Sequence, residues 1–287
     1  MRPTMASSLE GRPPVEDAAI ERVLEEIVRP VGYVPWEYLS RQQLLAQNIA
    51  RRRRGRPTRV LDIGCGDGAL TLTLREAAGF EIAAMDILPE RVAAVRARRR
   101  ARAESSVERL HLVLADAEAG LPFRAHAFDV VVATEVMEHL DRPGSLFQEI
   151  RRVLRPGGRF FMTTPNLEAL PLRLLKILPR PVVRRFAASL AQEHLHPELL
   201  SRRPSHPDEH RREGFTLREL TDLGKQASLR LVEGHAYRIP LPDKLMRRTP
   251  KRLARRLARM GTREIPLGLQ LYCEFARPEP PGGPAAT

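Results

Sequence analysis

A buried strand that runs into a glycine-rich turn constrains this chain more than any other feature. Residues 60–63 are apolar except for Asp62, and glycine then occupies positions 64, 66 and 68. An apolar helical pattern follows directly, with leucine at 70, 72 and 74. Glycine permits positive φ angles and a close approach of the backbone to a ligand, and a helix start presents unpaired N–H groups. The stretch therefore predicts a strand, a ligand-binding turn and a helix, the opening unit of an α/β sheet.

This turn differs from a dinucleotide-binding loop in spacing and in charge. Its glycines do not follow the G-x-G-x-x-G pattern, and Asp62 lies inside the end of the strand. A carboxylate repels a pyrophosphate and attracts a cation. Three more acids follow later predicted strands: Asp86 after 79–85, Asp116 after 109–115 and Glu135 after 129–133. Because the carboxyl ends of parallel strands share one edge, we expect a site for a cationic ligand at that edge.

Strands alternate with helices along most of the chain, which predicts a doubly wound, Rossmann-like parallel sheet. We expect a disordered segment at 1–14, helices and a basic linker at 15–56, the main domain at 57–276 and a flexible tail at 277–287. No apolar run is long enough to span a membrane. Two cysteines make no disulfide framework, so a cytoplasmic chain is expected.

Several segments, in this order, resemble the motifs of class I S-adenosylmethionine (SAM) methyltransferases. They are V-L-D-I-G-C-G-D-G at 60–68, the acid at 86, D-A-E-A-G-L-P-F at 116–123 with F-D-V-V at 128–131, and L-R-P-G-G at 154–158, which is expected to be a turn into the fifth strand. The later segment H-R-R-E-G-F-T-L-R-E-L at 210–220 is similar to one in the O-methyltransferases of ubiquinone biosynthesis. The resemblance implies seven strands with an antiparallel last strand, and a helical lid insertion at about 167–210.

The resemblance also implies SAM as the cofactor and a set of residues that hold it. Asp86 would accept hydrogen bonds from the ribose hydroxyls, or else act as a helix N-cap. Asp116 would accept from the adenine amino group, or else be a turn aspartate. The cofactor residues implied are Asp62, Gly64, Cys65, Gly66, Gly68, Asp86, Ile87, Asp116, Ala117 and Thr134.

Catalytic candidates for the acceptor side are His139, His210 and Glu135. If the methyl acceptor is a hydroxyl, a general base helps, and histidine suits that role. His139 could equally cap the following helix. The histidines at 194, 196, 206 and 210 do not match a zinc-ligand spacing, so no metal is expected.

A basic amphipathic stretch covers residues 244–260. Leu253, Leu257 and Met260 repeat at helical spacing, and the remaining positions are mostly basic. This pattern is typical of a helix that lies on an anionic membrane, and it also suits a surface helix packed by its leucines. The net charge of +13 favours an anionic partner in either case. Peripheral contact with the inner membrane face is therefore an expectation.

The leading interpretation is a SAM-dependent methyltransferase that acts on a small or lipid-linked acceptor, at oxygen. An RNA methyltransferase is the alternative within the fold, but few aromatic side chains are available for base stacking. The N/D-P-P-Y/F motif of amino-methylating enzymes is absent after the fourth strand, where T-E-V-M stands. A non-catalytic membrane-binding or nucleic-acid-binding protein is the third alternative, and the full set of acids and glycines argues against it. The pattern indicates no oligomeric state.

Overall fold

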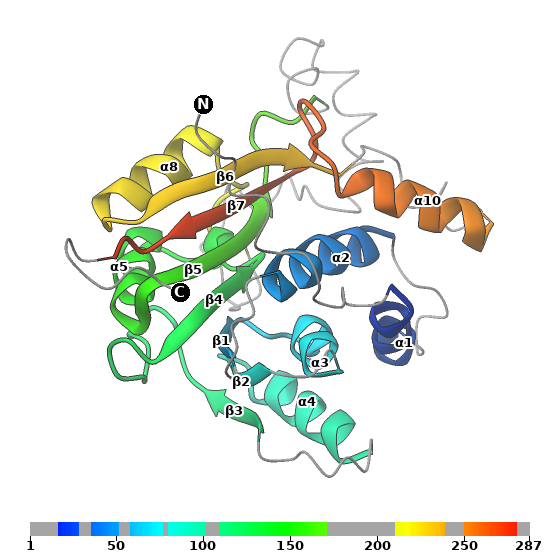
Figure 1. The fold of residues 1–287 in the computed structure, drawn as a ribbon, viewed down its shortest axis with the longest axis horizontal. Coiled ribbons are helices and arrows are strands. Elements are labelled where there is room, and N and C mark those ends of the chain that lie inside the picture. Colours follow the sequence, from blue (N-terminus) through cyan, green and yellow to red (C-terminus); the bar gives the residue numbers. More distant parts are fainter. Residues whose placement is uncertain are drawn as a thin grey trace, which may run out of the picture.

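Seven strands form one sheet in the order β3-β2-β1-β4-β5-β7-β6 (Figure 1). The computed structural model describes residues 17–28, 36–51, 58–76, 80–101, 109–170, 210–238 and 250–279. The strands are β1 (Thr58–Ile63), β2 (Phe80–Asp86), β3 (Leu110–Leu114), β4 (Phe128–Thr134), β5 (Leu154–Pro165), β6 (Arg230–Tyr237) and β7 (Gln270–Ala276). The expected disordered segment at 1–14, nearly all of the expected lid and most of the tail lie outside the described residues.

The first five strands are parallel, and β7 lies antiparallel between β5 and β6. The predicted doubly wound sheet with an antiparallel last strand is therefore confirmed. One local expectation was wrong. L-R-P-G-G was expected as a turn before the fifth strand, but it lies inside β5, where the pairing with β4 shifts between Phe128 and Val130. Gly157 takes a φ of +72° at this irregularity.

Helices cover both faces of the sheet (Figure 1). They are α1 (Asp17–Val28), α2 (Trp36–Ala50), α3 (Ala69–Glu76), α4 (Pro89–Ala101), the short 3₁₀ helix η3 (Met137–His139), α5 (Pro143–Val153), α8 (Leu217–Gln226) and α10 (Lys251–Gly261). None of the helices in the described stretches is long and apolar enough to cross a membrane. Thr216 and Glu219 form a capping box at the start of α8.

Alternate residues of the strands feed two separate cores, as the period of two along a strand requires. Val60 and Val130 pack with α1, α2 and α3 on one face. Leu61 and Val131 pack with α5 and α8 on the other face. The central strands are thus buried on both sides, which explains why they read as continuous apolar runs in the sequence.

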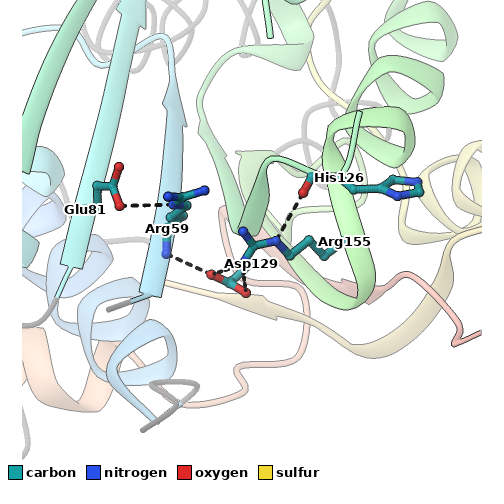
Figure 2. Close-up of polar contacts among 5 residues, drawn as sticks. All are labelled: Arg59, Glu81, His126, Asp129 and Arg155. Atoms are coloured by element: carbon teal, nitrogen blue, oxygen red, sulfur yellow. Dashed lines mark hydrogen bonds and ion pairs between the residues drawn. The ribbon is translucent and has the colours of Figure 1, made fainter. Parts of the chain in front are cut away.

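An ionic cluster ties together the amino-terminal ends of the central strands (Figure 2). Asp129 at the start of β4 accepts hydrogen bonds from the backbone N–H of Arg59 at 2.9 Å and from the guanidinium of Arg155 at 3.1 Å. The side chain of Arg59 pairs in turn with Glu81 of β2 at 3.0 Å. These contacts fix the strands at one edge of the sheet and leave the carboxyl-terminal edge to carry the site.

Candidate active site

A cavity of about 330 Å³ opens at the carboxyl-terminal edge of the sheet. Its wall combines the ends of β1, β2, β3 and β4 with side chains from the N-terminal helices α1 and α2. Nine of the predicted cofactor residues line it: Asp62, Gly64, Cys65, Gly66, Asp86, Ile87, Asp116, Ala117 and Thr134. The topology therefore brings to one place residues that are more than 70 positions apart in the chain, which the strand pattern predicted.

The three glycines of the turn have different surroundings, although all have positive φ angles. A Cβ on Gly64 would come within 2.5 Å of a methyl group of Val136, so glycine lets the turn pack against the segment after β4. A Cβ on Gly66 would meet nothing within 4 Å, which leaves room for a ligand in the cavity. Gly68 does not line the cavity: a Cβ there would meet Val95 of α4 at 2.8 Å. The predicted cofactor residue Gly68 thus lies at a helix–helix contact.

Asp62 is the most deeply buried acid in the cavity wall, with 1% of its surface exposed. Thr71 donates a hydrogen bond to its Oδ2 at 2.5 Å. Its Oδ1 has no hydrogen-bond partner among the described residues. Burial raises the pKa of Asp62 to about 7, and nearby Asp86 adds to the effect. A buried carboxylate oxygen without a donor fits a cationic N–H group of a ligand, which would supply the missing partner.

Asp86 and Asp116 both shape the loops that follow their strands. Asp86 accepts from the backbone N–H of Gly66 at 2.8 Å and from that of Leu88 at 3.0 Å. Asp116 accepts from the backbone N–H of Glu118 at 2.8 Å. The alternative role of Asp116 as a turn aspartate is thus present, whereas the N–H groups that Asp86 binds lie before α4 and not in its first turn. A carboxylate oxygen has two lone pairs, so these bonds still leave acceptor capacity toward a ligand.

The N-terminal helices close one side of the cavity, and this contribution was not assigned to particular residues from the sequence. Ile27 of α1 and Arg41 and Gln42 of α2 line the wall. Gln42 is 4% exposed, and its side-chain oxygen has no hydrogen-bond partner among the described residues. Arg41 and Gln42 belong to the polar run S-R-Q-Q at 40–43 of the second helix, and nothing in the sequence separates them from solvent-facing positions.

Glu135 is held in place from several elements at once. Its backbone has a φ of +52°, an unfavourable conformation for a residue with a side chain. Its two carboxylate oxygens accept from Thr163 of β5 at 2.8 Å and from Gln270 of β7 at 2.5 Å. Arg41 forms an ion pair with it at 3.5 Å, which links α2 to the sheet. Glu135 is therefore a rigidly positioned anion in the cavity wall.

The two candidate histidines meet beside the cavity. The rings of His139 and His210 contact each other edge to face, with centroids 4.6 Å apart. His139 lines the cavity, and His210 lies behind it. His139 ends the 3₁₀ helix η3. It does not cap the following helix α5, whose N-cap residue is Arg142.

A third group, Glu138, completes this cluster. A carboxylate oxygen of Glu138 and one ring nitrogen of each histidine lie within 4.8 Å of one another. Glu138 is fully buried and accepts from Thr164 at 3.0 Å, while its Oε1 has no hydrogen-bond partner among the described residues. Burial, reinforced by Glu135, raises the pKa of Glu138 well above its ordinary value. Such a cluster can hold and move a proton, and its donor set could also hold a divalent cation.

Comparison with known proteins gives a consistent picture. Residues 61–162 match the family model of a methyltransferase domain. A ubiquinone biosynthesis O-methyltransferase of Xanthomonas oryzae pv. oryzae is 33% identical over 108 residues, which is 38% of this chain and 43% of that protein. A malonyl-[acyl-carrier protein] O-methyltransferase of Enterobacter lignolyticus is 36% identical over 132 residues, 46% of this chain and 47% of that protein. The chain thus spans about half the length of the curated relatives it matches.

The match to solved structures covers more of the chain and concerns the fold. A sarcosine dimethylglycine methyltransferase structure from Galdieria sulphuraria aligns with a TM-score of 0.59 at 15% identity, over 91% of this chain and 98% of that one. At this identity the likeness shows a common fold.

Proposed function

Because the chain belongs to the class I SAM-dependent methyltransferase family, we propose that it transfers a methyl group from SAM to a hydroxyl oxygen of a small or lipid-linked acceptor. One observation carries the proposal: the cavity joins Asp62, whose Oδ1 has no hydrogen-bond partner within the described stretches, to further acids at neighbouring strand ends. In a protein of net charge +13, this concentration of carboxylates suits a cationic cofactor.

The residues present fit the proposed cofactor. Bound SAM supplies a methyl group on a sulfonium that is already activated for displacement. In this proposal Asp62 accepts hydrogen bonds from the ammonium end, and Gly66 lets the backbone approach the ligand. Asp86 would hold the ribose, Asp116 and Ala117 would hold the adenine, and Ile87, whose side chain is 42% exposed, would offer an apolar contact. Because methyl transfer is an in-line displacement, the main task of this wall is alignment and exclusion of water.

The histidine cluster supports an oxygen acceptor. A hydroxyl must lose its proton as it attacks, and His139 lines the cavity where it can take that proton. His210 contacts the ring of His139 and would hold its orientation, and buried Glu138 would supply an acceptor behind the pair. The O-methyltransferase names of the relatives agree with this choice. Glu135 is held by Thr163, Gln270 and the ion pair with Arg41, so we assign it to positioning.

The test combines cofactor binding with product analysis. Calorimetry with SAM on the full chain should show binding, and its absence at high micromolar concentration would refute the proposal. Methyl transfer is then measured with a polyprenylated catechol, a small catechol and RNA as acceptors. Transfer to RNA alone would replace the proposed acceptor class.

Histidine variants test the catalytic assignment. We expect His139→Ala to lower kcat about 10²–10⁴-fold, the range of general base catalysis, with SAM affinity retained. His111→Ala, at an exposed position on β3, is the matched control and should leave kcat unchanged. Activity with and without a chelator separates proton transfer from assistance by a bound cation. Equal kcat in the His139→Ala variant and the control would remove His139 from the mechanism.

A further inference from the structure

The helix α10 carries apolar side chains on its solvent side. Leu253 and Met260 are 49% and 53% exposed, and Leu257, at the position between them, is half-buried. At 3.6 residues per turn these three side chains fall within roughly 60° of arc on the helix. A surface helix that packs by its leucine stripe would bury this face. In the described part of the chain most of the stripe instead remains exposed to solvent.

Arginines flank this apolar ridge. Arg252, Arg256 and Arg259 are all exposed. The same helix geometry places them roughly 60–120° around the axis from Leu253, all on the same side of the ridge. The sequence of α10 itself contains no acidic residue. The surface is therefore an apolar ridge beside a cationic flank.

The helix is fixed to the body of the protein by other contacts. It packs along α2 (Figure 1). At its end, the backbone N–H of Arg238 after β6 donates to the carbonyl oxygen of Gly261 at 3.0 Å. Because α10 is already anchored in this way, its exposed ridge is not needed to hold the helix in the fold.

We propose that α10 docks the protein on an anionic membrane surface. The ridge of Leu253 and Met260 enters the boundary between headgroups and acyl chains, and the arginine flank contacts the anionic headgroups. The charge of the flank selects this partner over a second apolar protein surface, because only an anionic layer satisfies both features.

The placement of α10 relates this surface to the proposed reaction. The neighbouring helix α2 packs against α10 and contributes Arg41 and Gln42 to the cavity wall. Docking through α10 would hold that wall next to the lipid surface. Membrane docking would give a lipid-linked acceptor a short path to the cavity. This role of α10 rests on the proposed function.

The experiment is co-sedimentation of the full chain with vesicles of phosphatidylcholine, with and without phosphatidylglycerol. We expect binding to the anionic vesicles and a loss of binding at high salt. Replacing Arg252, Arg256 and Arg259 with glutamine should weaken partitioning on the order of 100-fold, since each basic residue near such a surface contributes about a fivefold change. Arg96, Arg100 and Arg124 are also exposed, and their triple glutamine variant is the charge-matched control.

The apolar ridge is tested separately. Leu253→Gln with Met260→Gln should weaken binding to the anionic vesicles at low salt, whereas Val232→Gln at an exposed position of β6 should not. Equal binding of both arginine variants, or binding to RNA with none to vesicles, would overturn the proposal. SAM calorimetry on the same proteins keeps the two proposals apart: absence of vesicle binding by the unsubstituted chain, with intact SAM binding, would refute only the membrane surface.

Discussion

Replacement of Asp62 by asparagine should stabilise the empty protein at neutral pH and weaken its binding of SAM. Asp62 is buried, and its Oδ1 has no partner among the described residues. Asparagine has nearly the same shape, keeps an oxygen that can accept from Thr71 and cannot ionise. The substitution therefore removes the cost of a buried charge together with the group that attracts a cation.

The size of the expected stability change follows from the pKa of Asp62. Burial raises the pKa of Asp62 to about 7, roughly three pH units above the ordinary aspartate value of about 3.9. At 1.36 kcal/mol for each pH unit, ionisation of this group costs the folded state about 4 kcal/mol. The folded pKa is raised, so the stabilising contribution is complete below about pH 4 and is lost as the pH rises through about 7. An unpaired amide N–H in the variant costs about 1–3 kcal/mol at every pH.

The assay is urea unfolding of both proteins between pH 4 and pH 8. The free energy of unfolding of the variant, minus that of the wild type, should grow by about 4 kcal/mol across this range. Contributions from Glu138 occur in both proteins and cancel in the difference. Parallel curves would refute the reasoning, because they would mean that Asp62 ionises without cost.

Binding gives an independent measurement of the same group. A cationic ligand favours the carboxylate, so SAM affinity in the wild type should fall about tenfold for each pH unit below 7. Binding near pH 6.5 should release a proton, which calorimetry in buffers of different ionisation enthalpy detects. The Asp62→Asn variant should show weak binding and no proton release.

Three further predictions concern the turn, the sheet and the link to α2. Gly64→Ala should destabilise the fold more than Gly66→Ala in thermal unfolding, because both have positive φ but only the first meets a side chain at 2.5 Å. Arg155→Met should cost about 1–3 kcal/mol in urea unfolding with SAM affinity unchanged, since it leaves Asp129 short of a partner at the edge far from the cavity. Glu135→Gln should weaken SAM binding and increase hydrogen exchange in α2, because the ion pair that links this helix to the sheet is lost; unchanged exchange would contradict that link.

Much of the site was predictable because its elements depend on short stretches of sequence. The strand, turn and helix around Gly66, and the acids that end later strands, each depend on a few neighbouring residues. Parallel strands then place those acids at one edge, whatever the details of packing. The acid–base cluster was less accessible, since His210 lies 71 positions after His139 and the buried carboxyl of Glu138 reads in the sequence as an ordinary helix-turn acid.

The sequence by itself determined the alternation of strands and helices that builds the sheet and the acidic character of the cofactor pocket, because hydrophobic periodicity and glycine positions act over short distances. Only the tertiary structure decided which side chains complete that pocket. Arg41 and Gln42 line the pocket because α2 packs beside it. Gly68 does not line it, because this glycine faces Val95 of α4 instead. Burial decided the rest: whether Asp62 holds a proton, and whether the leucines of α10 face the protein or the solvent, depends on neighbours that are distant in the chain.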